Sequence, residues 1–363
     1  IQIGNFLSDN VSLLGFGQFL VMLTVVWWAW IGETFYQNRY VTDDIIHRIM
    51  VFTQMFAVAT LGLSISGAFG ELYIQFTLAY VTIRLLLVVM FIRASLSHPE
   101  SRELTRSYAF GFSFGIAIWL GSLLLPAEYH WVGWLVGISV ELLVPQLPNI
   151  RKLRQTWGID LHHISERVGI FTIIVLGESF VKILDDSQGI VLGINEFAFS
   201  AIGLTVLYCL WWLYFSDTAD ELIDIKNNWK STLWLYGHLP LSIGLVAFGV
   251  GAKKAFAAVV SYPNEAINPD YRLLYTAAIV LYLLALAMID IGLDDKQTST
   301  RQRTEAITHL IGAILIAIWG IAFTEVTPIL FITPIMIILL VQVIISIYQT
   351  RQATQASAGI IVS

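Results

Sequence analysis

The chain carries little charge for its length. Asp, Glu, Lys and Arg make up 13% of its 363 residues, against about 25% in ordinary soluble domains. Apolar residues make up 57%, and the mean hydropathy is +0.74. This balance excludes a soluble globular domain of ordinary composition and indicates an integral membrane protein.

Cysteine and enzyme signatures are also scarce. Cys209, the single cysteine, lies in an apolar run, so no intrachain disulfide can form and no zinc or redox site is indicated. The HExxH, GxSxG and P-loop patterns are missing, as are paired aspartates in the middle of an apolar run. We therefore nominate no catalytic residue and no metal ligand, leave the cofactor unknown, and disfavour an intramembrane enzyme. A nucleic-acid partner is not expected.

Long apolar runs are what the chain does contain. They are about 20 residues long, enough to cross a hydrocarbon core of roughly 30 Å at 1.5 Å per helical residue. They lack the strict alternation of barrel strands, so helices are predicted. The fold class is thus an all-α polytopic membrane protein with about 11 transmembrane helices. The predicted spans are about 13–36, 46–68, 72–94, 104–125, 130–147, 162–184, 194–215, 235–260, 271–292, 305–325 and 328–348.

Lys and Arg are distributed unequally over the two sides of these spans. When successive loops are assigned alternately to the two sides of the membrane, 15 of the 20 basic residues fall on one side and 4 on the other, and Arg84 lies inside a span. Cytoplasmic loops collect Lys and Arg. The basic side is therefore predicted to be cytoplasmic, and the chain is predicted to be a multi-pass membrane protein with its C-terminus in the cytoplasm.

Two stretches of the chain resemble one another. The segment 27–34 (WWAWIGET) matches 211–218 (WWLYFSDT), and the string IAIW at 116–119 recurs at 316–319. We therefore expect two parallel six-helix repeats, with the first helix missing before the start of this chain. Residues 1–150 would form the first repeat, 151–350 the second, and 351–363 a cytoplasmic tail. Chance recurrence in an aromatic-rich membrane protein is the alternative.

Charged residues inside the spans are the candidate functional groups. Arg84 lies near the middle of the third span, where an unpaired charge costs several kcal/mol. Its expected partner is Glu178, Glu141 or Glu33, and the pair either locks helices together or lines a path; both remain open. Glu178 also has Lys182 four residues on, which offers a local helix pair.

Further candidates lie near the predicted cytoplasmic ends of the spans. Glu33 and Asp217 occupy equivalent places in the two repeats, and are either part of a substrate or cation site or simply solvated. His162, His163 and Glu166 have spacing that allows metal ligation, but a third ligand cannot be nominated. A cluster of helix caps and salt bridges is the simpler interpretation.

Four motifs resemble the bacterial low temperature requirement protein A family. They are WWAWIGETFYQNRYVTDDIIHR at 27–48, HHISERVGIFTIIVLGES at 162–179, LWWLYF at 210–215 and YGHLPL at 236–241. The resemblance implies a polytopic inner-membrane protein but no activity and no catalytic residue. Most residues of this chain that match the family's motif positions lie at the cytoplasmic ends of predicted spans, so the resemblance implies a cytoplasmic polar cluster. The cluster would contain Asn38, Arg39, Asp43, Asp44, His47, Arg48, His163, Glu166, Arg167 and His238.

Two functions are compatible with these features. The first is a transporter or channel with a polar path between the two repeats, lined by Arg84 and Glu178. The second is a non-transporting membrane module that binds lipid, pigment or partner subunits, with the buried charges locking helices. The expected partners are the lipid bilayer and a further membrane subunit, either a second copy of the chain or another protein.

Overall fold

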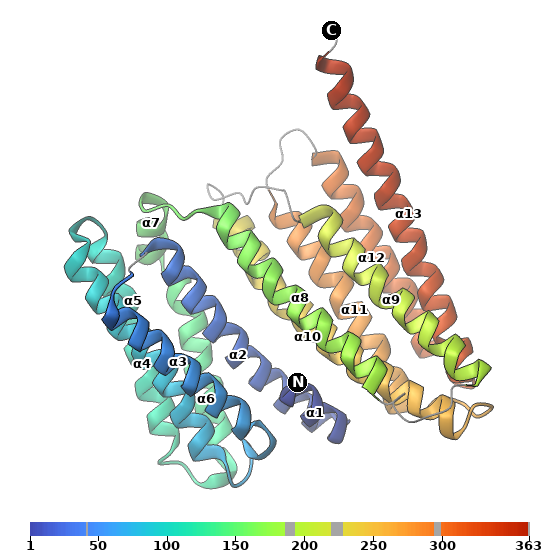
Figure 1. The fold of residues 1–363 in the computed structure, drawn as a ribbon, viewed down its shortest axis with the longest axis horizontal. Coiled ribbons are helices and arrows are strands. Elements are labelled where there is room, and N and C mark those ends of the chain that lie inside the picture. Colours follow the sequence, from blue (N-terminus) through green and yellow to red (C-terminus); the bar gives the residue numbers. More distant parts are fainter. Residues whose placement is uncertain (41–42, 186–192, 219–227, 294–298, 362–363) are drawn as a thin grey trace. The chain divides into compact units, whose positions relative to one another are not determined.

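The computed structural model describes residues 1–40, 43–185, 193–218, 228–293 and 299–361. Every regular element in these ranges is a helix (Figure 1). The chain divides into two compact units. The first comprises Ile1–Phe6 and Leu13–Ile164, and the second comprises Leu7–Ser12 and Ser165–Ser363. Each unit is considered by itself below.

The first unit contains six α-helices and four single 3₁₀ turns. A short helix that the sequence did not predict, α1 (Gln2–Asp9), precedes them and is divided between the two units after Phe6. Helix α4 packs against α2, α3 and α5, and α6 packs against α2 and α5. The elements are α2 (Leu13–Arg39), α3 (Ile45–Ser64), η1 (Ile65–Gly67), α4 (Tyr73–Ser97), η2 (Pro99–Ser101), α5 (Arg102–Ser122), η3 (Ala127–Tyr129), α6 (His130–Leu143), η4 (Val144–Gln146) and α7 (Pro148–Thr156).

In the second unit, successive helices from α9 to α13 pack together, and α9 also packs against α13. Helix α11 lies between α10 and α12, and α13 packs against α9, α10 and α12. The neighbouring helices run side by side in Figure 1. The elements are α8 (Leu161–Asp185), α9 (Ile194–Thr218), α10 (Asn228–Ser261), α11 (Pro269–Gly292), α12 (Ser299–Ala322) and α13 (Pro328–Ile361). The last of these continues into the predicted tail, 351–363.

A helix is present at each of the eleven predicted spans, but not all of them qualify as spans by length and apolarity. Eight do, among the described residues, and a ninth is possible if the bent pair His130–Gln146 and Pro148–Thr156 is one span. This pair is bent by 49°. Helices α5 and α8 do not pass the same criterion. The predicted number of about 11 is therefore not confirmed, and the repeat organisation stays a prediction.

Side chains cap the starts of two helices. Asp44 precedes α3 with an extended backbone, and its side chain accepts a hydrogen bond from the backbone N–H of His47 at 2.9 Å. Asn268 accepts one from the N–H of Asp270, and Pro269 occupies the first turn of α11. Both side chains satisfy N–H groups that the helix itself leaves without partners.

Glycines allow α10 and α11 to approach closely. A Cβ atom on Gly244 would lie 2.8 Å from the carbonyl oxygen of Ala278, and one on Gly292 would lie 2.6 Å from the backbone nitrogen of Trp234. Close contact through small residues is the usual way in which membrane helices gain van der Waals energy. It fixes α11 against α10 and thereby positions the polar end of α11 described below.

Candidate functional site

Arg84 on α4 and Glu141 on α6 form a fully buried ion pair in the first unit. The Nε of Arg84 lies 2.6 Å from Oε2 of Glu141, and both side chains are 0% exposed. Glu141 was one of the three partners predicted for Arg84. The pair neutralises two charges that would each cost several kcal/mol if buried alone.

The surroundings of this pair are aromatic and closely packed. Trp28 donates from Nε1 to Oε2 of Glu141 at 3.1 Å, and the Tyr80 hydroxyl donates to the same oxygen at 2.9 Å. The guanidinium of Arg84 lies 4.4 Å from the ring centroid of Phe112, a cation–π contact. Helices α2, α4, α5 and α6 thus all contribute to one charged centre.

Glycines on two of these helices leave room for the pair. A Cβ on Gly32 would lie 2.6 Å from Nη1 of Arg84, and one on Gly115 would lie 2.6 Å from Cγ of Glu141. The charged side chains are therefore packed tightly against backbone. This arrangement fits a lock between helices better than the lining of an open path.

The other two candidate partners of Arg84 have partners of their own. Glu178 lies 3.8 Å from Lys182 on the same helix, and its side chain is 12% exposed. This is the local helix pair that the sequence offered as an alternative. Glu33 accepts hydrogen bonds from Gln37 at 2.7 Å and from Gln54 at 3.1 Å.

Glu33 belongs to a network that joins α2 to α3. The side-chain nitrogen of Gln37, which donates to Glu33, also lies 3.0 Å from Nε2 of His47. The His47 ring is buried and stacks on Tyr36. The network shows that Glu33 is hydrogen-bonded and half-buried, so the simple expectation of a solvated carboxylate does not describe it.

Two aspartates connect the start of α3 to basic side chains. Asp44 pairs with Arg93 of α4, and Asp43 receives two hydrogen bonds from Arg48 at 2.8 and 3.0 Å. The hydrogen bond from Arg93, together with that from the backbone of His47, lowers the pKa of Asp44 to about 2. The hydrogen bonds and charge of Arg48 likewise lower the pKa of Asp43. Both carboxylates are ionised at neutral pH and hold the helix start in place.

Asn38 is tied to the segment before α8. Its side-chain amide exchanges two hydrogen bonds with the backbone of Asp160, at 2.9 and 3.0 Å. The carboxylate of Asp160 in turn accepts from the backbone N–H of His163 at 3.1 Å. Arg39 stacks over Phe35 with 6.0 Å between the guanidinium carbon and the ring centroid.

The predicted cytoplasmic cluster is therefore brought together in part. Its members from the first unit surround the ends of α2 and α3. Glu166 and Arg167 are exposed on the second-unit part of α8, and His238 is buried about three turns into α10. The ring of His238 contacts the carbonyl of Trp234 at 2.7 Å and the hydroxyl of Tyr214 at 3.2 Å. The side chain of Asp217 lies outside the described residues.

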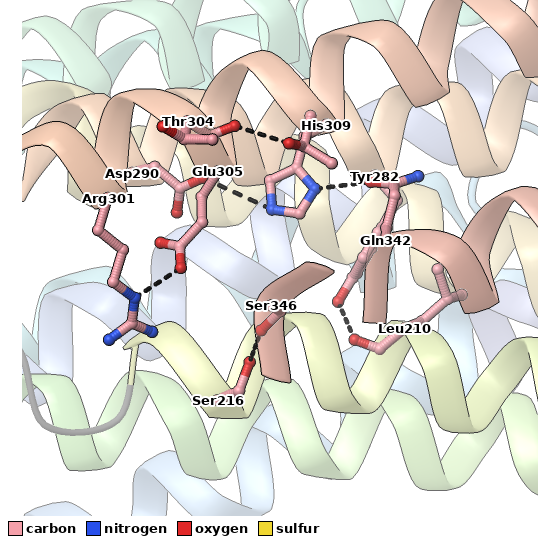
Figure 2. Close-up of polar contacts among 11 residues, drawn as sticks. Leu210, Ser216, Tyr282, Asp290, Arg301, Thr304, Glu305, His309, Gln342 and Ser346 are labelled. Atoms are coloured by element: carbon pink, nitrogen blue, oxygen red, sulfur yellow. Dashed lines mark hydrogen bonds and ion pairs between the residues drawn. The ribbon is translucent and has the colours of Figure 1, made fainter. Parts of the chain in front are cut away.

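The second unit holds a further buried cluster, which was not predicted from the sequence (Figure 2). His309 of α12 lies between Asp290 of α11 and Gln342 of α13. Its Nδ1 is 2.9 Å from the side-chain oxygen of Gln342, and its Nε2 is 3.6 Å from Oδ2 of Asp290. All three residues are at most 4% exposed. We call them the Asp290 cluster.

The cluster continues toward the start of α12. Glu305 lies one turn before His309 and receives a hydrogen bond from Nε of Arg301 at 2.7 Å. The side chains of Glu305 and Arg301 are 5% and 17% exposed, so exposure increases toward the helix end. Residues 301, 305 and 309 are spaced four apart, which puts them on one face of α12. A series of ionisable groups therefore leads from the helix end to the buried histidine.

Residue patterns did contain a signal for this cluster. Gln342 is the single polar residue in the run 334–345, and a polar residue in such a run is costly unless it has a partner. His238 and His309 lie about three turns inside helices α10 and α12.

Together, the apolar helices and buried polar centres define a multi-pass helical membrane protein. The family model for the bacterial low temperature requirement A protein (LtrA) matches residues 1–345. The chain therefore belongs to the LtrA family, which confirms the resemblance seen in the sequence. It is similar to "Uncharacterized protein RA0937" of Rhizobium meliloti (strain 1021), with 26% identity over 309 residues, covering 78% of this chain and 71% of the relative. Solved structures give no match.

Proposed function

We propose that this LtrA family protein is a transporter or channel of the inner membrane in which the Asp290 cluster binds and releases a proton. The observation that carries the proposal is the buried carboxylate and imidazole, Asp290 and His309, held between three helices. Ionisable residues inside membrane proteins most often mark ion or proton pathways. The proposal retains two six-helix repeats, a polar path and a cytoplasmic C-terminus.

The hydrogen bonding of His309 defines what the cluster can do. With the amide oxygen of Gln342 facing the ring, as it is placed here, Nδ1 of His309 is the donor and carries a hydrogen. The Nε2 atom then faces Asp290 either as an acceptor or, when protonated, as a donor. The two side chains together carry a net charge of −1 without a shared proton and 0 with it.

In the proposed cycle, the buried side chains of Asp290 and His309 hold one shared proton between them. An uncompensated carboxylate in apolar surroundings costs several kcal/mol, and one bound proton removes that cost. The separation of 3.6 Å is longer than a direct hydrogen bond. Proton exchange thus requires the side chains to approach or one water to bridge them. Glu305, one turn away, supplies the next acceptor toward the end of α12.

The Arg84 and Glu141 pair takes a different role in this proposal. Its dry packing supports a lock that holds α4 and α6 together, in place of the path through Arg84 and Glu178 expected from the sequence. The same observation favours the second candidate, a non-transporting membrane module with internal charge locks. Proton flux separates the two functions.

The test uses the full chain reconstituted in liposomes that contain a pH-sensitive dye, with a membrane potential imposed by potassium and valinomycin. We expect acidification of the lumen that exceeds that of protein-free liposomes and falls at least tenfold in Asp290→Asn and His309→Gln. Glu265→Gln, an exposed acid of the same unit, is the matched control and keeps the wild-type rate. A wild-type rate equal to that of empty liposomes, or one unchanged in Asp290→Asn, refutes the proposal.

A further inference from the structure

A groove on the surface of the first unit lies between α5, α6 and the bend that leads to α7. Its volume is about 570 Å³, within the range of roughly 300–1,000 Å³ typical of ligand pockets. Gly111 and Val144 form a close contact at which a Cβ on the glycine would lie 2.7 Å from the valine. The remaining lining residues are Ser107, Phe110, Phe114, Val140, Leu143, Leu147, Pro148, Asn149 and Ile150.

The lining is apolar along most of the groove and polar at one end. Phe110 and Phe114, both on α5, are 79% and 59% exposed. Ser107 and Asn149 supply the polar side chains, at the start of α5 and of α7. An apolar channel with a polar end matches the shape of a lipid, with an acyl chain along the aromatic rings and a head group beside Ser107.

Positive charge lies at the polar end. Arg106 is four residues before Phe110 on α5, and Lys152 is three residues after Asn149 on α7, so each lies on the same helix face as a lining residue. Both side chains are exposed. Glu103 is the acidic side chain nearest in sequence, which leaves this end of the groove with a net positive charge. The sequence predicts that this end faces the cytoplasm, where anionic lipids attract basic side chains.

We propose that this groove binds one anionic phospholipid of the surrounding membrane, with an acyl chain between α5 and α6 and the phosphate beside Arg106 and Lys152. Two further basic residues of α7 already donate to the bend: Arg151 to the side-chain oxygen of Gln146 at 2.9 Å, and Arg154 to the carbonyl of Pro145 at 3.3 Å. They therefore hold the bend in shape, and recognition of the head group falls to Arg106 and Lys152. The proposal is independent of proton flux through the second unit.

The test places a fluorescent label at the polar end of the groove. In a Cys209→Ala background, Ser107→Cys is labelled with bimane and the full chain is reconstituted with phospholipids that carry brominated acyl chains. We expect brominated phosphatidylglycerol to quench the label more strongly than brominated phosphatidylcholine at equal mole fraction. The control label at Phe56→Cys, a position on α3 where the native residue is 72% exposed, is quenched equally by both lipids.

Charge removal then tests the head-group contact. In Arg106→Gln with Lys152→Gln, the preference for phosphatidylglycerol falls by about fivefold for each cation removed. Equal quenching by both lipids at Ser107, or a preference that survives the double substitution, overturns the proposal. Native mass spectrometry of the chain without cysteine changes gives a second measurement, in which wild type retains phosphatidylglycerol and the double variant does not. Equal retention by both proteins also overturns it.

Discussion

The buried pair of Arg84 and Glu141 offers a sharp test of how charge holds the first unit together. In Glu141→Gln the amide oxygen can still accept from Trp28 and Tyr80, so the substitution removes the negative charge and little else. Arg84 then stays fully buried with its charge uncompensated. In Arg84→Met, the carboxylate of Glu141 stays buried with its negative charge uncompensated.

The expected magnitude follows from burial. Breaking a fully buried ion pair by removing one partner typically costs about 3–5 kcal/mol, whereas replacing both partners by neutral groups is often close to neutral. Each single variant should therefore lose about 3–5 kcal/mol. At about 2–4 °C per kcal/mol for a unit of this size, the midpoint falls by about 6–20 °C. The double variant should be more stable than either single variant.

Thermal unfolding of the full chain in detergent micelles, followed by tryptophan fluorescence, measures these shifts. Glu128→Gln, an exposed carboxylate of the same unit, is the control and should change stability by no more than about 0.5 kcal/mol. A buried ion pair that holds the unit together is refuted if the single variants lose less than about 1 kcal/mol, or if their losses simply add in the double variant.

Two further predictions concern packing and pH. Gly115→Ala should lower stability by about 1–3 kcal/mol, because the added Cβ would lie 2.6 Å from Glu141. Gly17→Ala, where the added Cβ meets nothing within 4 Å, should raise stability by about 0.5–1 kcal/mol. Equal midpoints of the two variants in thermal unfolding would contradict the close packing of Gly115 against Glu141. The pKa of Asp44 is lowered to about 2 by Arg93, against an unfolded value of about 3.9. Its contribution is therefore complete above about pH 5 and is lost as the pH falls toward 2. Asp44→Asn keeps the helix cap and should flatten this part of the unfolding curve; a curve identical to wild type would count against the ion pair.

Much of the local structure could be predicted from sequence because local physics determines it. The caps Asp44 and Asn268 act through hydrogen bonds within a few residues, and the apolar runs become helices since a membrane satisfies backbone groups in no other simple way. The number of spans could not be predicted in the same way. Helices α5 and α8 carry more polar residues than the length of their apolar runs suggested.

The candidate sites were harder to predict because they depend on contacts between distant segments. The sequence restricted the partner of Arg84 to three acids, and α4 and α6, which both pack on α2 and α5, place Glu141 2.6 Å from it. The Asp290 cluster joins residues from three helices, and no spacing in the sequence relates Asp290 to Gln342. Only the isolated position of Gln342 in an apolar run pointed to it.

The most direct test of the account is the protonation of Asp290 itself. Infrared difference spectra of the full chain in lipid, recorded between acidic and alkaline pH with isotope-labelled aspartate, report protonated buried carboxyl groups by their C=O stretching band. The account predicts a band that appears with proton binding in wild type, shifts in His309→Gln and is missing in Asp290→Asn. A spectrum of Asp290→Asn identical to that of wild type would contradict the central claim that this buried pair exchanges a proton.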